Sequence, residues 1–152
     1  MEQSLKIAGR VEWIGVSRGF RQSIEPQSEV TVAVGTGIDG DYHSRKRPGG
    51  KRQITLIQHE HLTAIAAKSM RDSVGPEVLR RNIVVSGIVL TSLVGRTFRI
   101  GDAVLKGTGP CTPCARMDEN LGPGGRLAMK GLGGITAAVI TGGLIRVGDA
   151  VA

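Results

Sequence analysis

The amino-acid sequence predicts a mainly β protein, a β-barrel with two or three short helices. Glycine is abundant, with 23 residues among 152, and aromatic side chains make up only 3% of the chain. Abundant glycine indicates many tight turns, because glycine adopts backbone angles that other residues avoid. The core must therefore consist of Val, Ile, Leu and Ala side chains, which recur in short alternating segments. Because this length corresponds to one ordinary domain, we expect residues 1–152 to form a single domain.

Alternation of apolar and polar residues indicates where the strands lie. In one of these segments Val30, Val32 and Val34 are expected to share a face. Strands are expected over residues 6–17, 29–34, 53–57, 83–85, 90–93 and 135–141. Apolar residues at helical spacing predict a helix over residues 59–68, and a shorter helical turn is expected over residues 75–80.

A seven-residue segment occurs twice in the C-terminal half of the chain. Residues 98–104 (FRIGDAV) recur as residues 145–151 (IRVGDAV). Gly and Asp accept the dihedral angles of a tight turn, whereas the Val and Ile residues around them favour strands. Each copy is therefore predicted to form a β-hairpin with a Gly-Asp turn.

The chain is basic: 20 Lys and Arg residues against 13 Asp and Glu residues give a formal net charge of +7. This excess predicts an anionic partner. Nucleic acid is the usual partner of a small basic domain, but proteins that bind single strands stack bases on aromatic side chains, which this chain almost lacks. A phosphorylated small molecule or cofactor fits the charge at least as well, so nucleic acid is not the expected partner.

The sequence also favours a location inside the cell. It has no long uncharged apolar run that would cross a membrane, and residues 1–6 lack the basic and apolar regions of a signal peptide. Two cysteines are too few for a secreted disulfide framework. We therefore expect a cytoplasmic protein with reduced thiols and no membrane partner.

The two cysteines, Cys111 and Cys114, form a C-x-x-C motif that leaves four interpretations open. It can be half of a zinc site, although His43, His59 and His61 do not show a zinc-finger spacing. It can be a redox dithiol, although its flanks lack the strand–helix pattern of thioredoxin, or it can be two small buried cysteines in a turn. It can also carry one reactive thiolate, a nucleophile and soft metal ligand that nearby positive charge would stabilise.

Two basic segments are candidates for binding an anion. Residues 45–47 (RKR) and 51–52 (KR) surround a Pro-Gly-Gly turn, although such a run is most often a solvated loop. Residues 80–82 (RRN) come directly before an expected strand, where Asn82 can hydrogen-bond a heterocycle or cap the turn.

Glycine-rich turns and histidines complete the candidates. The turns at residues 122–126 and 130–134 can form anion-binding nests of backbone N–H groups, but the spacing of a Walker loop is absent, so ATP hydrolysis has no support. Asp41 and His43 can form an acid–base pair. The H-E-H segment at residues 59–61 lacks the metalloprotease spacing, so its histidines are expected to be structural or solvent-facing.

Taken together, these segments resemble the MOSC domain, the C-terminal module of molybdenum cofactor sulfurases. Residues 37–43 (GIDGDYH) resemble the family's G-x-x-G-D-x-H loop, and residues 81–88 (RNIVVSGI) resemble its R-x-N-hydrophobic-x-x-x-G element. Residues 98–102 then lead to the family cysteine at Cys114, and residues 142–149 are similar to the family's closing segment. The resemblance covers about residues 5–152 and implies a β-barrel.

In this family the cysteine is implied to bind the molybdenum of a pterin cofactor or to carry sulfur as a persulfide. Cys114 is the matching residue, whereas Cys111 occupies a position that varies among relatives. The resemblance implies an oxidoreductase that reduces N-hydroxylated compounds. The alternatives are a sulfur carrier with a persulfide on Cys114, of the sulfurtransferase type, or a cofactor-binding module without catalysis. The sequence lacks the pyridoxal-phosphate module of the full sulfurases, so a separate electron donor or sulfur donor protein is expected.

The expected site combines one thiol with polar and cationic groups. Cys114 is the expected catalytic residue and metal ligand, and a small molecule is the expected substrate. The residues expected to bind the anionic molybdopterin cofactor are Asp41, His43, Arg45, Arg47, Arg52, Arg81, Asn82, Arg116 and Arg126. We further expect the basic groups at residues 45–47, 51–52 and Arg81 to line one mouth of the barrel.

Overall fold

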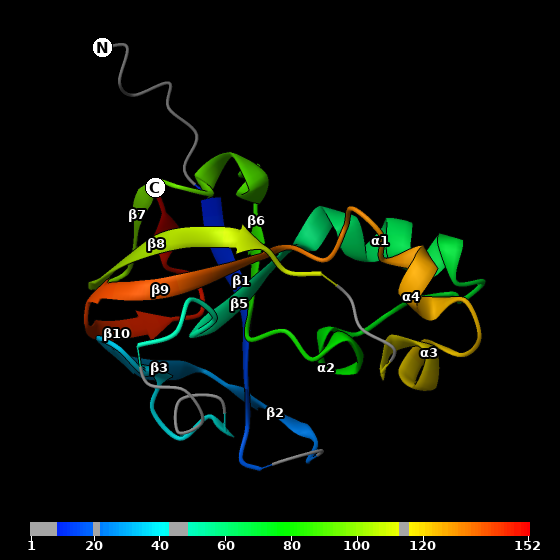
Figure 1. Cartoon of the computed structure of the whole chain (residues 1–152), viewed down its shortest axis with the longest axis horizontal. Helices are drawn as coiled ribbons and strands as arrows, with labels where there is room; N and C mark the ends of the chain where they lie inside the picture. Colours follow the sequence, from blue (N-terminus) through cyan, green and yellow to red (C-terminus); the bar gives the residue numbers. More distant parts are fainter. Residues whose placement is uncertain (1–8, 20–21, 43–48, 113–115) are drawn as a thin grey trace.

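The computed structural model describes residues 9–19, 22–42, 49–112 and 116–152, and there the predicted mainly β fold is confirmed. Seven strands close into a barrel (Figure 1). In order around it they are β11 (Ala150–Val151), β7 (Thr97–Ile100), β8 (Ala103–Pro110), β9 (Ile135–Thr141), β5 (Ile54–Gln58), β6 (Ile83–Ser86) and β1 (Gly9–Ser17). Pairing of β11 with β1 closes the ring.

Smaller elements extend the barrel. The strand β2 (Ile24–Gln27) pairs with β1, and a second sheet contains β10 (Gly143–Arg146), β3 (Glu29–Ala33) and β4 (Gly37–Ile38). The helices of the described part are α1 (His59–Lys68), α2 (Pro76–Leu79), the 3₁₀ helix η3 (Leu90–Leu93), α3 (Arg116–Leu121) and α4 (Gly125–Ala128). The four α-helices gather at one side of the barrel (Figure 1). None of the helices in these residues is long and apolar enough to span a bilayer.

The strands β5 and β6 separate two apolar cores, which is why they are buried almost throughout. Ile54 and Leu56 of β5 pack inside the barrel, whereas Ile57 packs in a second core beneath the helices. In β6, Ile83 belongs to the barrel core and Val84 to the helical core. Successive strand residues point to opposite faces, so a strand between two cores has no polar face. These two strands run parallel to each other, and α1 and α2 connect them.

One predicted strand is wrong: residues 90–93 form the helix η3. The Ser92 hydroxyl donates a hydrogen bond to the Val89 carbonyl at 2.6 Å, and the Ser92 amide donates to the same oxygen at 3.1 Å. The Leu90 amide donates to the Gln58 side chain rather than to a strand neighbour. Local bonds between side chain and backbone of this kind compete with sheet pairing.

The second copy of the repeated segment does not form a hairpin, although the first does. The strands β7 and β8 pair across the Gly-Asp turn, but β10 pairs with β3 and β11 pairs with β1 and β7. The second turn itself is present, because the Asp149 amide donates to the Arg146 carbonyl at 3.0 Å. The repeat therefore supplies both partners of the β11–β7 contact in the ring.

The helices and one strand end also differ from the expectation. Four α-helices are present in the described residues instead of two or three, because α3 was not predicted and α4 begins within residues 122–126, which were expected to form a glycine-rich turn. Val34 is 62% exposed and does not share the buried face of Val30 and Val32, since β3 ends at Ala33. Gly35 then turns the chain with a φ of +84°.

Candidate functional site

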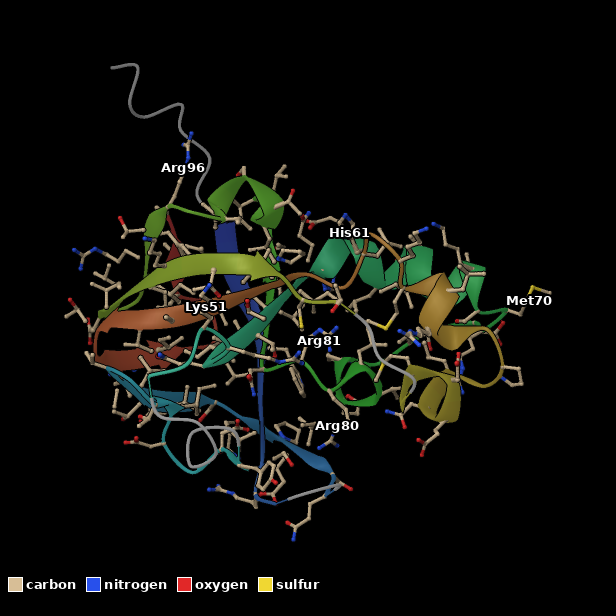
Figure 2. All side chains as sticks on the ribbon, viewed as in Figure 1. Lys51, His61, Met70, Arg80, Arg81 and Arg96 are labelled. Carbon is tan, nitrogen blue, oxygen red and sulfur yellow. The ribbon has the colours of Figure 1, made fainter. Side chains whose placement is uncertain are left out.

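The guanidinium group of Arg81 is buried where three segments of the chain meet. Its Nε donates to the Gly133 carbonyl at 2.8 Å, one terminal nitrogen to the Leu79 carbonyl at 3.0 Å, and the other to the Cys111 carbonyl at 3.4 Å. Arg81 is only 3% exposed. Figure 2 shows it between the end of β8 and α2. Arg81 thus connects the end of α2, the end of β8 and the turn before β9.

Two glycines allow this close approach. The Cys111 amide donates to the Gly134 carbonyl at 2.8 Å, which continues the β8–β9 pairing past its last strand residues. A Cβ atom on Gly133 would collide with the Cys111 carbonyl, and one on Gly134 would collide with the Leu56 carbonyl. Gly134 also has a φ of +87°, which other residues rarely adopt. The sequence G-G before β9 is therefore required by the packing of three backbones.

Asp41 and Asn82 form a second buried network next to Arg81. The Asn82 side-chain oxygen accepts two hydrogen bonds from Thr55, one from its amide at 3.1 Å and one from its hydroxyl at 3.2 Å. The Asn82 side-chain nitrogen donates to the Gly15 carbonyl at 3.1 Å and to Asp41 Oδ1 at 3.4 Å. The same Asp41 oxygen accepts from the Ser17 amide at 2.9 Å. This network fastens the start of β6 to β5, β1 and the loop after β4; direct contact of Asp41 or Asn82 with a cofactor stays a prediction.

The described cations of the expected site differ in burial and in the elements that carry them. Lys51 and Arg52 are exposed directly before β5, and Arg81 is buried before its parallel neighbour β6. The Lys51 carbonyl accepts from the Thr108 hydroxyl at 2.6 Å, which fixes this corner against β8. Arg126 is exposed on α4. Binding of an anion by these groups stays a prediction.

Several expected site residues lie outside the described residues. These are Cys114, His43, Arg45, Lys46 and Arg47. Arg116 begins α3, but the structure does not describe its side chain.

The C-x-x-C motif is therefore described only in part. Cys111 is a free cysteine and is 2% exposed. Within the described ranges, no group of three or more His, Cys, Asp and Glu residues could hold a metal ion. His59 is exposed and His61 is partly exposed on α1, as expected.

A cavity that the sequence did not predict lies between α3 and α4. Its volume is about 350 Å³, and its lining residues are Asp118, Gly124, Arg126, Leu127 and Lys130. The Arg126 amide donates to Asp118 Oδ1 at 2.9 Å. The cations Arg126 and Lys130 lie in the two glycine-rich turns that the sequence analysis considered as anion sites, and these turns were the sequence feature that could have indicated the cavity. Nothing in the sequence singled out Asp118 or Leu127.

Glu60, at the start of α1, has a pKa below its ordinary value. It accepts hydrogen bonds from the Gly87 amide at 2.9 Å and from the Gln58 side chain at 3.4 Å. Partial burial acts to raise the pKa of Glu60, but these hydrogen bonds and the neighbouring His59 outweigh it and hold the pKa below the ordinary 4.5. Glu60 joins the first turn of α1 to the loop after β6.

The class of protein is a small basic β-barrel in which a cysteine-bearing segment of the sequence joins the strand β8 to the short helices α3 and α4. The model of the MOSC domain matches residues 39–152, and the chain belongs to this family. No curated protein matches the sequence significantly.

Crystal structures of three bacterial proteins share the fold. The YuaD protein of Bacillus subtilis is 23% identical with a TM-score of 0.81, and the alignment covers 95% of this chain and 94% of that one. YiiM of Escherichia coli is 19% identical with a TM-score of 0.70, covering 93% and 68%. YiiM of Geobacillus stearothermophilus is 17% identical with a TM-score of 0.75, covering 94% and 73%. At these identities the likeness establishes the fold alone.

Proposed function

We propose that this MOSC protein binds a molybdenum cofactor, with the Cys114 thiolate as a ligand of the metal, and reduces N-hydroxylated small molecules. The observation that carries the proposal is the match to the MOSC domain over residues 39–152. MOSC domains are generally linked to the molybdenum cofactor, and the matched range contains Cys114 and every residue expected to bind the cofactor.

The donor groups of the expected site fit such a cofactor in charge and in softness. The cofactor is anionic, and Arg52 and Arg126 are exposed cations without an ion pair among the described residues. A thiolate is the preferred protein ligand of a soft metal, and Cys114 is the thiol of the pair that the resemblance assigns to this role. Cys111 is buried and its backbone is held on both sides, which suits a supporting role.

When bound, the cofactor would supply the oxygen-atom chemistry that reduces the substrate. The overall reaction converts N–OH to N–H, takes up two electrons and two protons and releases one water molecule, so it requires a separate electron donor. The Cys114 thiolate would hold the metal, and exposed cations such as Arg52 would bind the anionic end of the cofactor. Arg81 would fix the Cys111 carbonyl and, with it, the backbone from which the Cys114 segment leaves β8.

Elemental analysis and pterin fluorescence test the proposal on protein purified anaerobically from a host that makes the cofactor. The wild-type protein should contain both molybdenum and pterin. Cys114→Ser should lose the metal, because an alcohol is a poor ligand for a soft metal, and should keep its fold. Cys111→Ser, the matched thiol control, should retain most of the metal.

Three other outcomes would change the assignment. Absence of both metal and pterin from the wild-type protein overturns the proposal. Equal loss of metal in the two variants would indicate a dithiol or zinc pair. Metal-free protein with one added sulfur atom on Cys114, seen by mass spectrometry, would indicate a sulfur carrier.

A further inference from the structure

The cavity between α3 and α4 combines positive charge with an exposed apolar side chain. We propose that it binds a small amphiphilic oxyanion, that is, a molecule that joins a carboxylate or phosphate group to an apolar ring or chain. Its volume of about 350 Å³ lies within the range of small-molecule sites, roughly 300–1,000 Å³.

Charge in the cavity favours an anion. Arg126 and Lys130 are both exposed, and no ion pair is found for either within the described residues. Both cations are lining residues of the cavity, Arg126 from α4 and Lys130 from the turn that follows it. The single carboxylate, Asp118, already accepts the Arg126 amide at Oδ1, so the two cations outnumber it. Its second oxygen can accept an N–H or O–H group of the same ligand.

Leu127 explains why the ligand should also have an apolar part. This side chain lines the cavity and is 73% exposed, whereas the next two residues, Ala128 and Met129, are buried. Water contact with so much leucine surface is unfavourable, and a ligand that covers it gains the free energy of removing that surface from water. An inorganic anion alone would leave Leu127 exposed.

The walls of the cavity are fixed before any ligand binds. A Cβ atom on Gly125 would collide with the Met117 carbonyl, so the backbones of α3 and α4 touch at this glycine. Met117, Leu121 and Met129 pack together below the contact. A preformed site does not have to be ordered on binding, which favours affinity for a small ligand.

The cavity also has a position that suits the substrate. The helix α3 begins at Arg116, directly after the segment that contains Cys114. If the proposed function holds, on which this step rests, the substrate is an N-hydroxylated compound with an anionic group. Its anion would contact Arg126 and Lys130, and its N–OH or N–H group would contact Asp118.

Titration of the purified, cofactor-free protein tests the site independently of the reaction. The probes are benzoate and phenyl phosphate, compared with inorganic phosphate, which lacks the apolar part, and benzyl alcohol, which lacks the charge. Nuclear magnetic resonance should show saturable shifts at the amides of Gly124 and Leu127 for the two amphiphilic anions. The stronger of these two probes identifies the oxyanion as carboxylate or phosphate.

Two variants change the cavity, and two variants elsewhere on the surface serve as controls. The double variant Arg126→Gln with Lys130→Gln should weaken binding of the better probe about tenfold, and Leu127→Ala about threefold or more. Arg96→Gln removes an exposed charge and Val89→Ala trims an exposed apolar residue elsewhere, and both should leave binding unchanged. Figure 2 shows Arg96 on the barrel side away from α4.

The inference is overturned if the amphiphilic anions bind no more tightly than inorganic phosphate, or if the cavity variants bind like the wild type. Its failure is distinguishable from that of the proposed function. Molybdenum-loaded protein that binds none of the probes contradicts the cavity alone. Metal-free protein that binds them with the expected pattern contradicts the cofactor alone.

Discussion

Replacement of Arg81 by methionine should lower the free energy of unfolding of the cofactor-free protein by about 2–4 kcal/mol. The variant removes the donors that now bind the carbonyls of Gly133, Leu79 and Cys111. A hydrogen bond to a charged group contributes about 1.5–3 kcal/mol, so the loss of three such bonds would by itself exceed the predicted loss of about 2–4 kcal/mol. The expected loss is smaller because the variant also removes the cost of burying a guanidinium group.

Arg81→Lys should lose about 1–3 kcal/mol, although it keeps the charge. The three acceptors belong to three different segments, and the compact ammonium group of lysine cannot reach all of them as the planar guanidinium does. Arg96→Met, at an exposed position, should stay within about 0.5 kcal/mol of the wild type.

Urea unfolding followed by circular dichroism measures these differences, and hydrogen exchange locates them. The amides of Cys111 and of the strands around it should exchange faster in Arg81→Met than in Arg96→Met, because the Cys111 amide bonds to Gly134 in the turn that Arg81 holds. If Arg81→Met is as stable as the wild type but retains less cofactor, Arg81 binds the ligand directly, and its three backbone hydrogen bonds do not stabilise the fold.

Two further predictions concern a glycine and a carboxylate. Gly134→Ala should cost about 2 kcal/mol or more in urea unfolding, because it combines a positive φ with a collision at the Leu56 carbonyl; Gly131→Ala, with a φ of +77° and open space, should cost about 1 kcal/mol, and equal losses would rule out the collision. Glu60 has a pKa below its ordinary 4.5 in the folded protein, so its contribution is present above pH 4.5 and is lost as the pH falls through the lowered value. Glu60→Gln should therefore be less stable than the wild type at neutral pH, by at most about 0.5 kcal/mol at this exposed site, and the difference should vanish in acid; a difference that grows in acid would contradict the shift.

Local patterns predicted most of the fold because the elements that they indicated have one dominant periodicity. The helix over residues 59–68 was predicted with its observed ends, and the strands β1, β5 and β9 were predicted from their apolar and β-branched residues. The repeated segment shows the limit of such patterns. Its two copies have nearly the same sequence, but one forms a hairpin and the other sends its strands to different sheets. Strand partners are set by tertiary packing, which a local pattern does not contain.

The site was predictable in its charges but not in its geometry. The sequence marked Arg81 as a cation before a strand, but only the structure shows that its guanidinium is buried against backbone carbonyls. The cavity depends on the contact between α3 and α4 at Gly125, and the sequence patterns predicted neither of these two short helices. Leu127 was not singled out because Leu127, Ala128 and Met129 form a short continuous apolar run, which has no helical or strand period.

The buried residues that carry the MOSC resemblance have a consequence for how this protein should be dissected. Asp41, Arg81 and Asn82 are 1%, 3% and 4% exposed, and their hydrogen bonds join the loop after β4 and the strands β1, β5 and β8 within this chain. Family motifs made of such residues indicate a shared fold rather than a shared ligand. Changing any of these residues leaves buried hydrogen-bonding groups without a partner, whichever ligand the protein binds. Loss of activity in variants of these three residues therefore cannot separate binding from folding. Variants of the exposed cavity residues can, since the hydrogen bonds described for these residues lie within α3, α4 and the turns beside them and not between barrel strands.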